Sequence, residues 1–432
     1  MSTVKPFRAV RPADNEKAEA IAALPYDVYS REEARAAVAR KPLSFLNIDR
    51  PETFFEPGHD MYAPEVYARA KEEYEARKAD GSYTVEDSDS YYVYELTMDG
   101  RSQTGIVGVT AVADYENGIC KKHENTVAEK EADRIRHVDT MSAQTGPIFL
   151  AYHADQTLGQ LVAEAKKNAP LFVFVTPEGI GQRVWRIGGT EEVRRVENAF
   201  AQVPATYIAD GHHRAASAVK VSQKRRGSAV PAEGRIESEY FLSVLFPDEE
   251  LKIFDYNRTV KDLNGLTVEE FLDKLESRSP FTVNKIAEKK DLPENDACEI
   301  MRPQQKGRVG MYLNGVFYEL TVKDEVMRAV EQDPVRCLDV SILQSGVLDP
   351  ILGIGDPRTD KRIRFTGGIR GLKSIVDLAE SFTEDGKAGV SFAMYPTSMQ
   401  ELFGVADAGL LMPPKSTWFE PKLRSGLFIH EI

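Results

Sequence analysis

The sequence has little cysteine and no long hydrophobic run. Its 432 residues contain three cysteines, Cys120, Cys298 and Cys337, which lie far apart and form no CxxC pair. This spacing argues against a disulfide framework and against a cysteine-rich zinc site. No apolar run approaches the roughly 18 residues of a membrane helix, and the first residues contain no apolar signal region. We therefore expect a cytoplasmic protein with no membrane partner.

Several familiar catalytic motifs are also absent. No GxGxxG loop follows a predicted strand, so a Rossmann domain has no support. The chain contains no GxxxxGK loop followed by Ser or Thr and no GxSxG nucleophile elbow. The fourth residue after His123 is Val127, so the zinc motif HExxH fails as well. A nucleotide-binding or catalytic role must therefore depend on other residues.

Negative charge exceeds positive charge. Lys and Arg together number 55 and Asp and Glu 68, which gives a formal net charge of −13. Binding to duplex DNA depends on neutralising phosphates, and the sequence contains no basic recognition helix, so we expect no nucleic acid partner. A hydrophobic fraction of 42% with 28% charged residues is typical of a globular chain. At about 150 residues per domain, the length favours two or three domains.

Helix and strand patterns alternate along the whole chain. They predict an α+β fold with mixed sheets, divided into an N-terminal segment 1–118, a core 119–263 and a C-terminal segment 264–432. Hydrophobic periodicity and turn residues predict the individual elements: helices at 32–40, 63–79, 124–140 and 268–275, strands at 148–152, 171–175, 206–209 and 362–365, and hairpins at 91–112, 241–256 and 310–322.

The clearest functional signal is the run Asp210-Gly211-His212-His213-Arg214, between a predicted strand and a predicted helix. The N-terminus of a helix presents free N–H groups and a positive field, and both favour a phosphate. Arg214 adds planar, charge-assisted hydrogen bonds, and Gly211 permits a tight turn. Asp210 can orient a histidine, bind a hydroxyl or lie near a magnesium ion. The alternative is a capped helix with solvated His and Arg side chains.

Two further segments contain candidate residues. His123 and Glu124 precede a helical run of mixed charge, where Glu124 is either a general base beside a phosphate site or an acidic cap on a surface helix. The Gly-rich loop 367–374 is either an anion site or an ordinary strand-to-helix connection. Four basic residues precede this loop: Arg358, Lys361, Arg362 and Arg364.

Longer runs resemble a bacterial family known as domain of unknown function one thousand and fifteen. They extend over essentially the whole chain: PYDV at 25–28, KHENT at 122–126, GPIFLAY at 146–152, ADGHHRAASA at 209–218, FDYNR at 254–258, DPRTDKRI at 356–363 and MPPKSTWFEPKLRSGL at 412–427. The part from KHENT to ADGHHRAASA also resembles, more distantly, the core of the ParB/sulfiredoxin superfamily. The version with DGHHR is similar to the free-serine kinase branch of that superfamily.

The resemblance implies a ParB/sulfiredoxin-like nucleotide-binding core at 119–263 and a kinase that phosphorylates a small hydroxyl compound, with free serine as one candidate. A regulatory nucleotide-binding module without turnover is the alternative. The partners would be a nucleotide, ATP or ADP with Mg²⁺, and a small-molecule substrate. Glu124 would be the catalytic base and Asp210 a second catalytic residue, and Asp27 in PYDV or Asp210 itself is the reserve candidate for the base. The phosphates would lie against Gly211, His212, His213 and Arg214.

Overall fold

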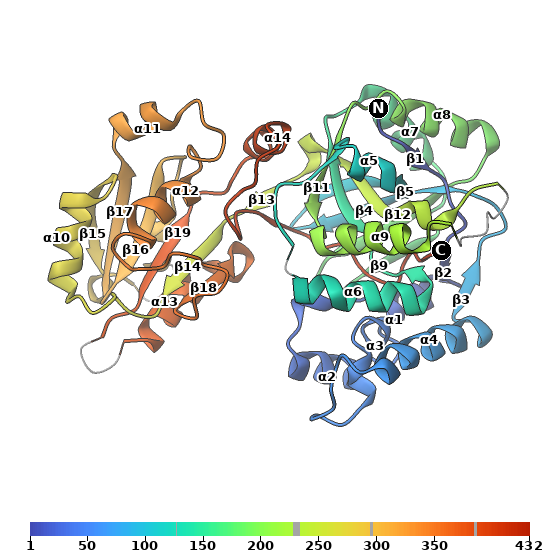
Figure 1. Ribbon diagram of the computed structural model, residues 1–432, viewed down its shortest axis with the longest axis horizontal. Helices are drawn as coiled ribbons and strands as arrows, with labels where there is room; N and C mark the ends of the chain where they lie inside the picture. Colours follow the sequence, from blue (N-terminus) through green and yellow to red (C-terminus); the bar gives the residue numbers. More distant parts are fainter. Residues whose placement is uncertain (127, 228–233, 294–296, 384–386) are drawn as a thin grey trace. The chain divides into compact units, whose positions relative to one another are not determined.

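The fold is described from a computed structural model of residues 1–432, without residues 127, 228–233, 294–296 and 384–386. The chain forms two compact units (Figure 1). The large unit contains Met1–Leu251 and Pro421–Ile432, and the small unit contains Lys252–Glu420. The predicted boundary after residue 118 falls inside the large unit, and the one after residue 263 falls inside the small unit. The predicted α+β class with mixed sheets is confirmed.

A nine-stranded sheet forms the centre of the large unit. Its order is β6-β11-β8-β12-β5-β4-β10-β9, and β1 pairs with β5. β6 runs parallel to β11 and β8 runs parallel to β12, while the other pairs are antiparallel. The strands are β1 (Val4–Lys5), β4 (Tyr91–Met98), β5 (Arg101–Ala111), β6 (Cys120–Lys121), β8 (Ile148–Tyr152), β9 (Phe172–Val175), β10 (Gly181–Ile187), β11 (Thr206–Asp210) and β12 (Tyr240–Pro247).

Helices cover this sheet and extend the unit. The apolar residues of α5 (Val112–Glu116), α7 (Gln156–Ala165), α8 (Thr190–Phe200) and α9 (His212–Arg225) share one core with the strands. α6 (Ala128–Met141) lies along α9 (Figure 1). The remaining elements are β2 (Val10–Pro12), α1 (Asn15–Ile21), η1 (Tyr26–Val28), α2 (Arg31–Arg40), α3 (Leu46–Asp49), η2 (Pro51–Phe54), α4 (Pro64–Ala79), β3 (Tyr83–Val85), β7 (Ala143–Gln144), η3 (Glu237–Glu239), η4 (Asp248–Glu250) and β21 (His430–Glu431). Among the residues that the structure describes, no helix has the length and apolar content needed to cross a membrane.

Local sequence signals account for several of these elements. Ser30 accepts from the Glu33 N–H, and Glu33 accepts from the Ser30 N–H, so a capping box begins α2 where the sequence predicts a helix. Between β4 and β5, Asp99 and Gly100 have φ angles of 51° and 76°. Asp-Gly is the residue pair that a two-residue hairpin turn with positive φ prefers, and the predicted hairpin is confirmed. All five residues of β8 are buried, as expected for a strand covered on both faces.

The small unit is built on a six-stranded antiparallel sheet in the order β15-β17-β16-β19-β14-β18. Its strands are β14 (Tyr256–Val260), β15 (Phe281–Glu288), β16 (Arg308–Leu313), β17 (Val316–Val322), β18 (Ile363–Gly367) and β19 (Val390–Met394), and β13 (Ile253–Phe254) pairs with β20 (Trp418–Phe419). The helical elements are α10 (Val268–Arg278), η5 (Lys289–Asp291), η6 (Ala297–Met301), α11 (Asp324–Val330), α12 (Asp339–Leu343), the π-helical turn η7 (Gln344–Leu348), η8 (Gly368–Arg370), α13 (Gly371–Ser381) and α14 (Met399–Asp407).

The predicted hairpin at 241–256 is wrong. β12 pairs with β5 and β8 in the large sheet, whereas β13 pairs with β20 and β14 pairs with β18 and β19. The acidic turn that follows β12 therefore leads from one unit to the other, because Leu251 ends the first part of the large unit. Two neighbouring apolar runs joined by a polar turn resemble a hairpin, but their pairing is decided by tertiary packing that a local pattern does not contain.

Candidate functional site

The predicted turn joins β11 to α9. Thr206–Asp210 form the strand, Gly211 has a φ of 95°, and His212 is the first residue of the helix. A φ of this size is easy for glycine and costly for other residues. Gly211 has no side chain to cap α9, and no side-chain hydrogen bond caps its start. The first N–H groups of α9 therefore provide the kind of site that binds anions in other proteins.

Arg214 connects this turn to the segment before β8. Its Nη1 donates to the Pro147 carbonyl at 2.5 Å, and its Nη2 donates to Asp210 Oδ2 at 3.0 Å. The guanidinium lies so close to Gly211 that a Cβ at this position would be 3.0–3.1 Å from three of its atoms. Arg214 thus links the DGHHR run to the predicted GPIFLAY strand, which is β8.

Asp210 lies between two cations. Besides the pair with Arg214, Lys422 Nζ approaches Asp210 Oδ1 at 3.4 Å. Burial opposes ionisation of this carboxyl, but Lys422 and Arg214 outweigh it and lower the pKa of Asp210 to about 2. The carboxylate is therefore ionised and engaged on both oxygens. Lys422 was not predicted, because it is 212 residues away in the chain.

The two histidines of the run have different surroundings. His212 is 8% exposed, and its ring meets the ring of His123 edge to face, with centroids 4.5 Å apart. Within the described part of the chain, His212 Nε2 is buried and has no hydrogen-bond partner. His213 lies near Glu131, whose pKa is lowered, against the effect of burial, by Lys220, Thr126 and His213.

Burial keeps the paired histidines neutral. It lowers the pKa of His123 to about 4, although Asp210 acts in the opposite direction. It also lowers the pKa of His212, and the nearby His123 lowers it further. Near neutral pH both imidazoles are therefore uncharged, and each has one N–H donor and one acceptor nitrogen.

Glu124 is brought to the same edge of the sheet. β6 and β11 are parallel, with Cys120 opposite Thr206 and Lys121 opposite Tyr207. Parallel strands that are paired in register end at the same edge, so the loop after β6 and the turn after β11 leave the sheet together. Glu124 is half-buried in that loop, directly after His123. The reserve candidate, Asp27, is exposed in η1.

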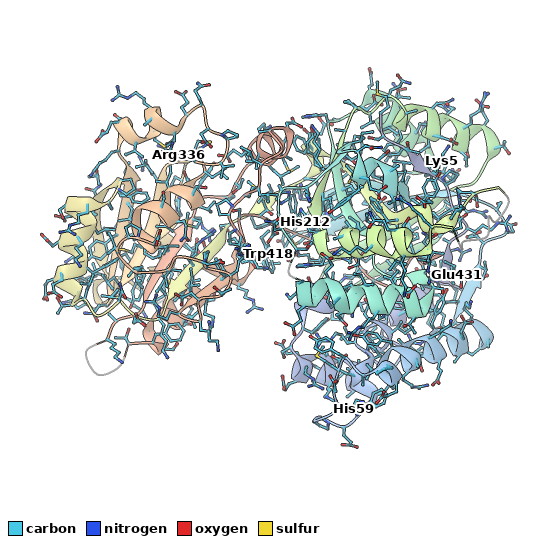
Figure 2. All side chains as sticks on the ribbon, viewed as in Figure 1. Lys5, His59, His212, Arg336, Trp418 and Glu431 are labelled. Atoms are coloured by element: carbon cyan, nitrogen blue, oxygen red, sulfur yellow. The ribbon has the colours of Figure 1, made fainter. Side chains whose placement is uncertain are left out.

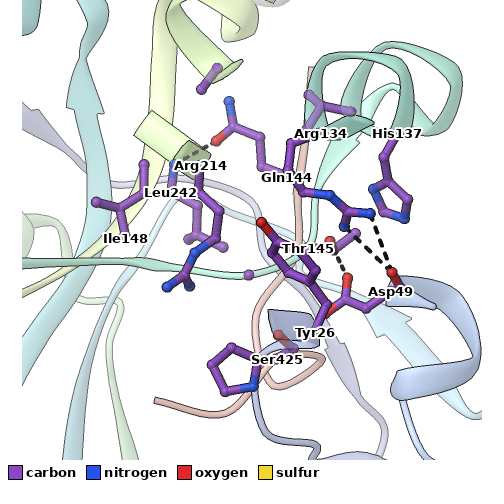
Figure 3. Close-up of a pocket in the computed structure, with 14 residues that line it drawn as sticks. Tyr26, Asp49, Arg134, His137, Gln144, Thr145, Ile148, Arg214, Leu242 and Ser425 are labelled. Carbon is purple, nitrogen blue, oxygen red and sulfur yellow. Dashed lines mark hydrogen bonds between the residues drawn. The ribbon is translucent and has the colours of Figure 1, made fainter. Parts of the chain in front are cut away.

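A small cavity of about 30 Å³ lies beside Arg214, which is one of its lining residues (Figure 3). Tyr26, from the PYDV run, extends into it between Arg214 and Arg134. The Arg134 guanidinium lies 4.0 Å from the centre of the Tyr26 ring, and Thr145 donates to Asp49 Oδ1 at 2.9 Å. The Tyr26 hydroxyl is buried without a hydrogen-bond partner in the described structure, and burial raises its pKa to about 12. The cavity has room for ordered water.

These cavity residues were not predicted as site residues. They come from separate elements, η1, α3, α6 and the segment before β8, and are buried side chains of ordinary types. In the sequence, PYDV contributed the reserve base Asp27 and GPIFLAY contributed a predicted strand, and both were family-like runs, but Tyr26 and Thr145 were not singled out. The signal that could have found the cavity is the pair of family-like runs at 25–28 and 146–152, which meet here.

Most arginines of the basic segment before α13 form hydrogen bonds or ion pairs with nearby residues of the same unit. Arg358 bonds to Asp356, and Arg362 bonds to Asp360 and to the carbonyls of Leu352 and Gly353. Arg364 donates to the Lys361 carbonyl at 2.7 Å. With its guanidinium groups engaged locally, this loop fits the ordinary strand-to-helix connection that the sequence left open.

Comparisons with known proteins agree with the family resemblance. A family model described as protein of unknown function (DUF1015) matches residues 4–341, so the chain belongs to that family. No curated protein matches the chain.

Three solved structures are distantly similar to the chain. One is SbnI with a C-terminal truncation from Staphylococcus aureus, with 11% identity, a TM-score of 0.35, and coverage of 73% of this chain and 82% of that chain. Another is free serine kinase in complex with AMP, with 15% identity, a TM-score of 0.32, and coverage of 73% and 86%. A mutant free serine kinase in complex with ADP has 13% identity, a TM-score of 0.32, and coverage of 74% and 88%. Likenesses this distant carry no argument about function.

Proposed function

We propose that this member of the DUF1015 family binds the phosphates of ATP or ADP at the turn Asp210–Arg214 and transfers a phosphoryl group to the hydroxyl of a small molecule, with free serine as a candidate acceptor. The observation that carries the proposal is His212 Nε2, which is buried at the start of α9 without a partner among the described residues. A buried polar atom without a partner is costly, and a ligand oxygen would satisfy it. The neighbouring helix N-terminus favours a ligand that is anionic.

The other residues of the turn have supporting roles in this proposal. Gly211 lets the backbone come close to a phosphate, because no Cβ projects there. Arg214 contributes positive charge at the turn, and each of its terminal nitrogens has a second hydrogen besides those given to Pro147 and Asp210. Asp210 holds Arg214 and Lys422 in place. His213 lies near Glu131 and lowers the pKa of that carboxyl.

Magnesium fits the proposal only as an ion delivered with the nucleotide. In the described part of the chain, no three His, Cys, Asp or Glu side chains gather to hold a metal ion, and Asp210 is already paired with two cations. Mg²⁺ commonly binds through one or two carboxylates together with substrate phosphates. When bound, it would neutralise phosphate charge and help to orient the transferred group.

Glu124 is our candidate for the general base. It lies at the sheet edge where β6 and β11 end, next to the histidine pair. Phosphoryl transfer is mostly positioning and charge neutralisation, so a well-placed carboxylate is sufficient to accept the hydroxyl proton. This assignment requires an acceptor hydroxyl within about 3 Å of the carboxylate, directly or through one water.

The first experiment is a nucleotide-consumption screen of the purified chain. ATP and ADP, each with Mg²⁺, are incubated with a panel of amino acids and small alcohols, and the nucleotide products are separated by chromatography. We expect turnover that depends on one class of hydroxyl compound. Nucleotide binding without turnover for any acceptor would support the regulatory module instead. If calorimetry detects no binding of either nucleotide, the proposal is wrong.

Glu124→Gln then tests the base. It should lower the turnover rate by about 10²–10⁴-fold and leave nucleotide affinity unchanged or higher, because a negative charge near the phosphates is removed. Glu129→Gln is the matched control, since it removes the same charge from an exposed position at the start of α6. A Glu124→Gln protein with a lowered melting temperature but normal turnover would remove Glu124 from the mechanism.

A further inference from the structure

The small unit contains a cleft of about 580 Å³ that the proposed function does not use. It lies where the end of α10, the start of α11, the loop before α12 and α12 itself meet. Pockets that hold small molecules usually measure about 300–1,000 Å³. The cleft is therefore large enough for a metabolite, unlike the small cavity beside Arg214.

Positive charge dominates the cleft. Arg278, Lys323 and Arg336 line it, against one acidic residue, Glu325. Lys323 Nζ donates to the Ser279 carbonyl at 2.9 Å, which fixes the direction of its ammonium group. Arg336 lies on the loop between α11 and α12 (Figure 2).

The two arginines of the cleft differ from several other arginines of the unit in having no ion pair, although Arg336 lies near Asp333 and lowers the pKa of that carboxyl. Neither Arg278 nor Arg336 forms an ion pair with any residue that the structure describes. By contrast, Arg308, Arg358 and Arg362 are paired with Glu319, Asp356 and Asp360. The guanidinium fork matches carboxylate and phosphate oxygens in pairs. Two unpaired forks beside an anchored ammonium therefore suit a ligand with more than one negative charge.

Part of the cleft wall is apolar. Val330 and Ile342 are buried, and Pro280 and Gly346 also line the wall. Gly346 belongs to the π-helical turn η7 and lies so close to Pro280 that a Cβ would be 2.3 Å from two of its ring carbons. The Ser341 hydroxyl is buried without a hydrogen-bond partner among the residues described. π-Helical turns are frequent at functional sites.

We propose that this cleft binds a small organic anion with at least two negative charges and a short apolar part, either a phosphate ester or a dicarboxylate. The charged groups would contact Arg278, Lys323 and Arg336, and the apolar part would lie against Val330 and Ile342. The ligand would also provide a partner for the Ser341 hydroxyl. This site is independent of the turn in the large unit, and its existence does not depend on the proposed phosphotransferase activity.

Calorimetry on the full chain with three probes tests the proposal. Phenyl phosphate, phthalate and inorganic phosphate are titrated at the same ionic strength. We expect at least one of the two organic dianions to bind more tightly than inorganic phosphate, because the apolar base contributes. Tighter binding of phenyl phosphate than of phthalate would identify phosphate esters as the ligand class, and the reverse would identify dicarboxylates. If none of the probes binds, or inorganic phosphate binds as tightly as both organic probes, the proposal is wrong.

Variants then locate the binding. Arg278→Ala and Arg336→Ala should each weaken the tighter organic probe by about ten-fold or more, the usual effect of losing a hydrogen bond to a charged group. Both side chains are exposed, so neither change should unfold the protein. Arg328→Ala is the matched control, because Arg328 lies on α11, is not among the residues that line the cleft, and among the described residues donates only to the Asp324 carbonyl. Arg214→Ala should leave the binding intact. Equal losses in the Arg328 control, or a loss only in Arg214→Ala, would overturn the assignment.

Discussion

Gly211→Ala is the substitution that most directly tests the geometry of the turn. At a φ of 95° an alanine is strained, and the left-handed region costs a residue with a Cβ about 1–2 kcal/mol. The new Cβ would also lie 3.0 Å from Arg214 Nη2 and 3.1 Å from its Cζ and Nε. Contacts this short force the guanidinium to retreat by a few tenths of an ångström.

Displacing the Arg214 guanidinium also lowers the stability of the folded state, because it weakens two hydrogen bonds. Arg214 donates to Pro147 at 2.5 Å and to Asp210 at 3.0 Å. Losing a hydrogen bond to a charged group costs about 1.5–3 kcal/mol, and loosening two of them without breaking them should cost about 1 kcal/mol. The total loss of stability is then about 2–3 kcal/mol. Nucleotide affinity should fall as well, because the displaced guanidinium of Arg214 would be less well placed for the phosphate that we propose at this turn.

Gly118→Ala separates these contributions. Gly118 also has a positive φ, 72°, but a Cβ there would meet nothing within 4 Å. This control should therefore lose only about 1–2 kcal/mol of stability and bind nucleotide normally. Urea denaturation and nucleotide calorimetry on both variants provide the measurements. Equal losses of stability, or an unchanged nucleotide affinity in Gly211→Ala, would show that the contact between Gly211 and Arg214 is unimportant.

Two further predictions concern titratable groups. His212→Phe keeps an aromatic ring against His123 but removes the nitrogen without a partner, so it should weaken nucleotide binding. Because the buried imidazole is neutral, the ratio of wild-type to variant affinity should stay constant between about pH 6 and 8. A ratio that rises as pH falls would indicate a charged histidine. In the small unit, burial raises the pKa of Asp339 to about 7, above its unfolded value, so the folded state binds a proton more tightly than the unfolded state. The free energy of unfolding should therefore fall by a few kcal/mol as pH rises from about 4 to 7. Asp339→Asn should flatten this dependence in urea denaturation, and an equal slope in both proteins would contradict the raised pKa.

The elements that were predicted well are those with strong local signals. The helix after Ser30 and the hairpins at Asp99-Gly100 and Asn314-Gly315 depend on capping and turn chemistry within a few residues. The hairpin predicted at 241–256 failed because its two strands belong to different units. A pattern of apolar and polar residues gives the period of a strand but not its partner.

For the candidate site, too, the contiguous residues could be predicted from the sequence and the long-range contacts could not. The run from Asp210 to Arg214 could be found because its residues are contiguous and stand between a strand and a helix. The contacts of that run do not follow from its own residues: His123 and Lys422 are 89 and 212 residues away, and the fold brings His123 there through the pairing of β6 with β11 and Lys422 through the C-terminal segment. The cavity beside Arg214 depends on Tyr26, Asp49 and Arg134 in the same way.

The different roles that we propose for Asp210 and Glu124 follow from the surroundings of the two carboxylates. The sequence left three roles open for Asp210: orienting a neighbour, binding a hydroxyl or lying near magnesium. With Lys422 and Arg214 on its two oxygens and a pKa of about 2, Asp210 is a very weak base. Removing its charge would take this carboxylate away from two half-buried cations, which is costly. The orienting role therefore fits Asp210 best, and within the proposed mechanism the proton of the acceptor hydroxyl falls to a carboxylate outside this ion pair. Glu124, which comes to the turn from the loop after β6, is the candidate for that role.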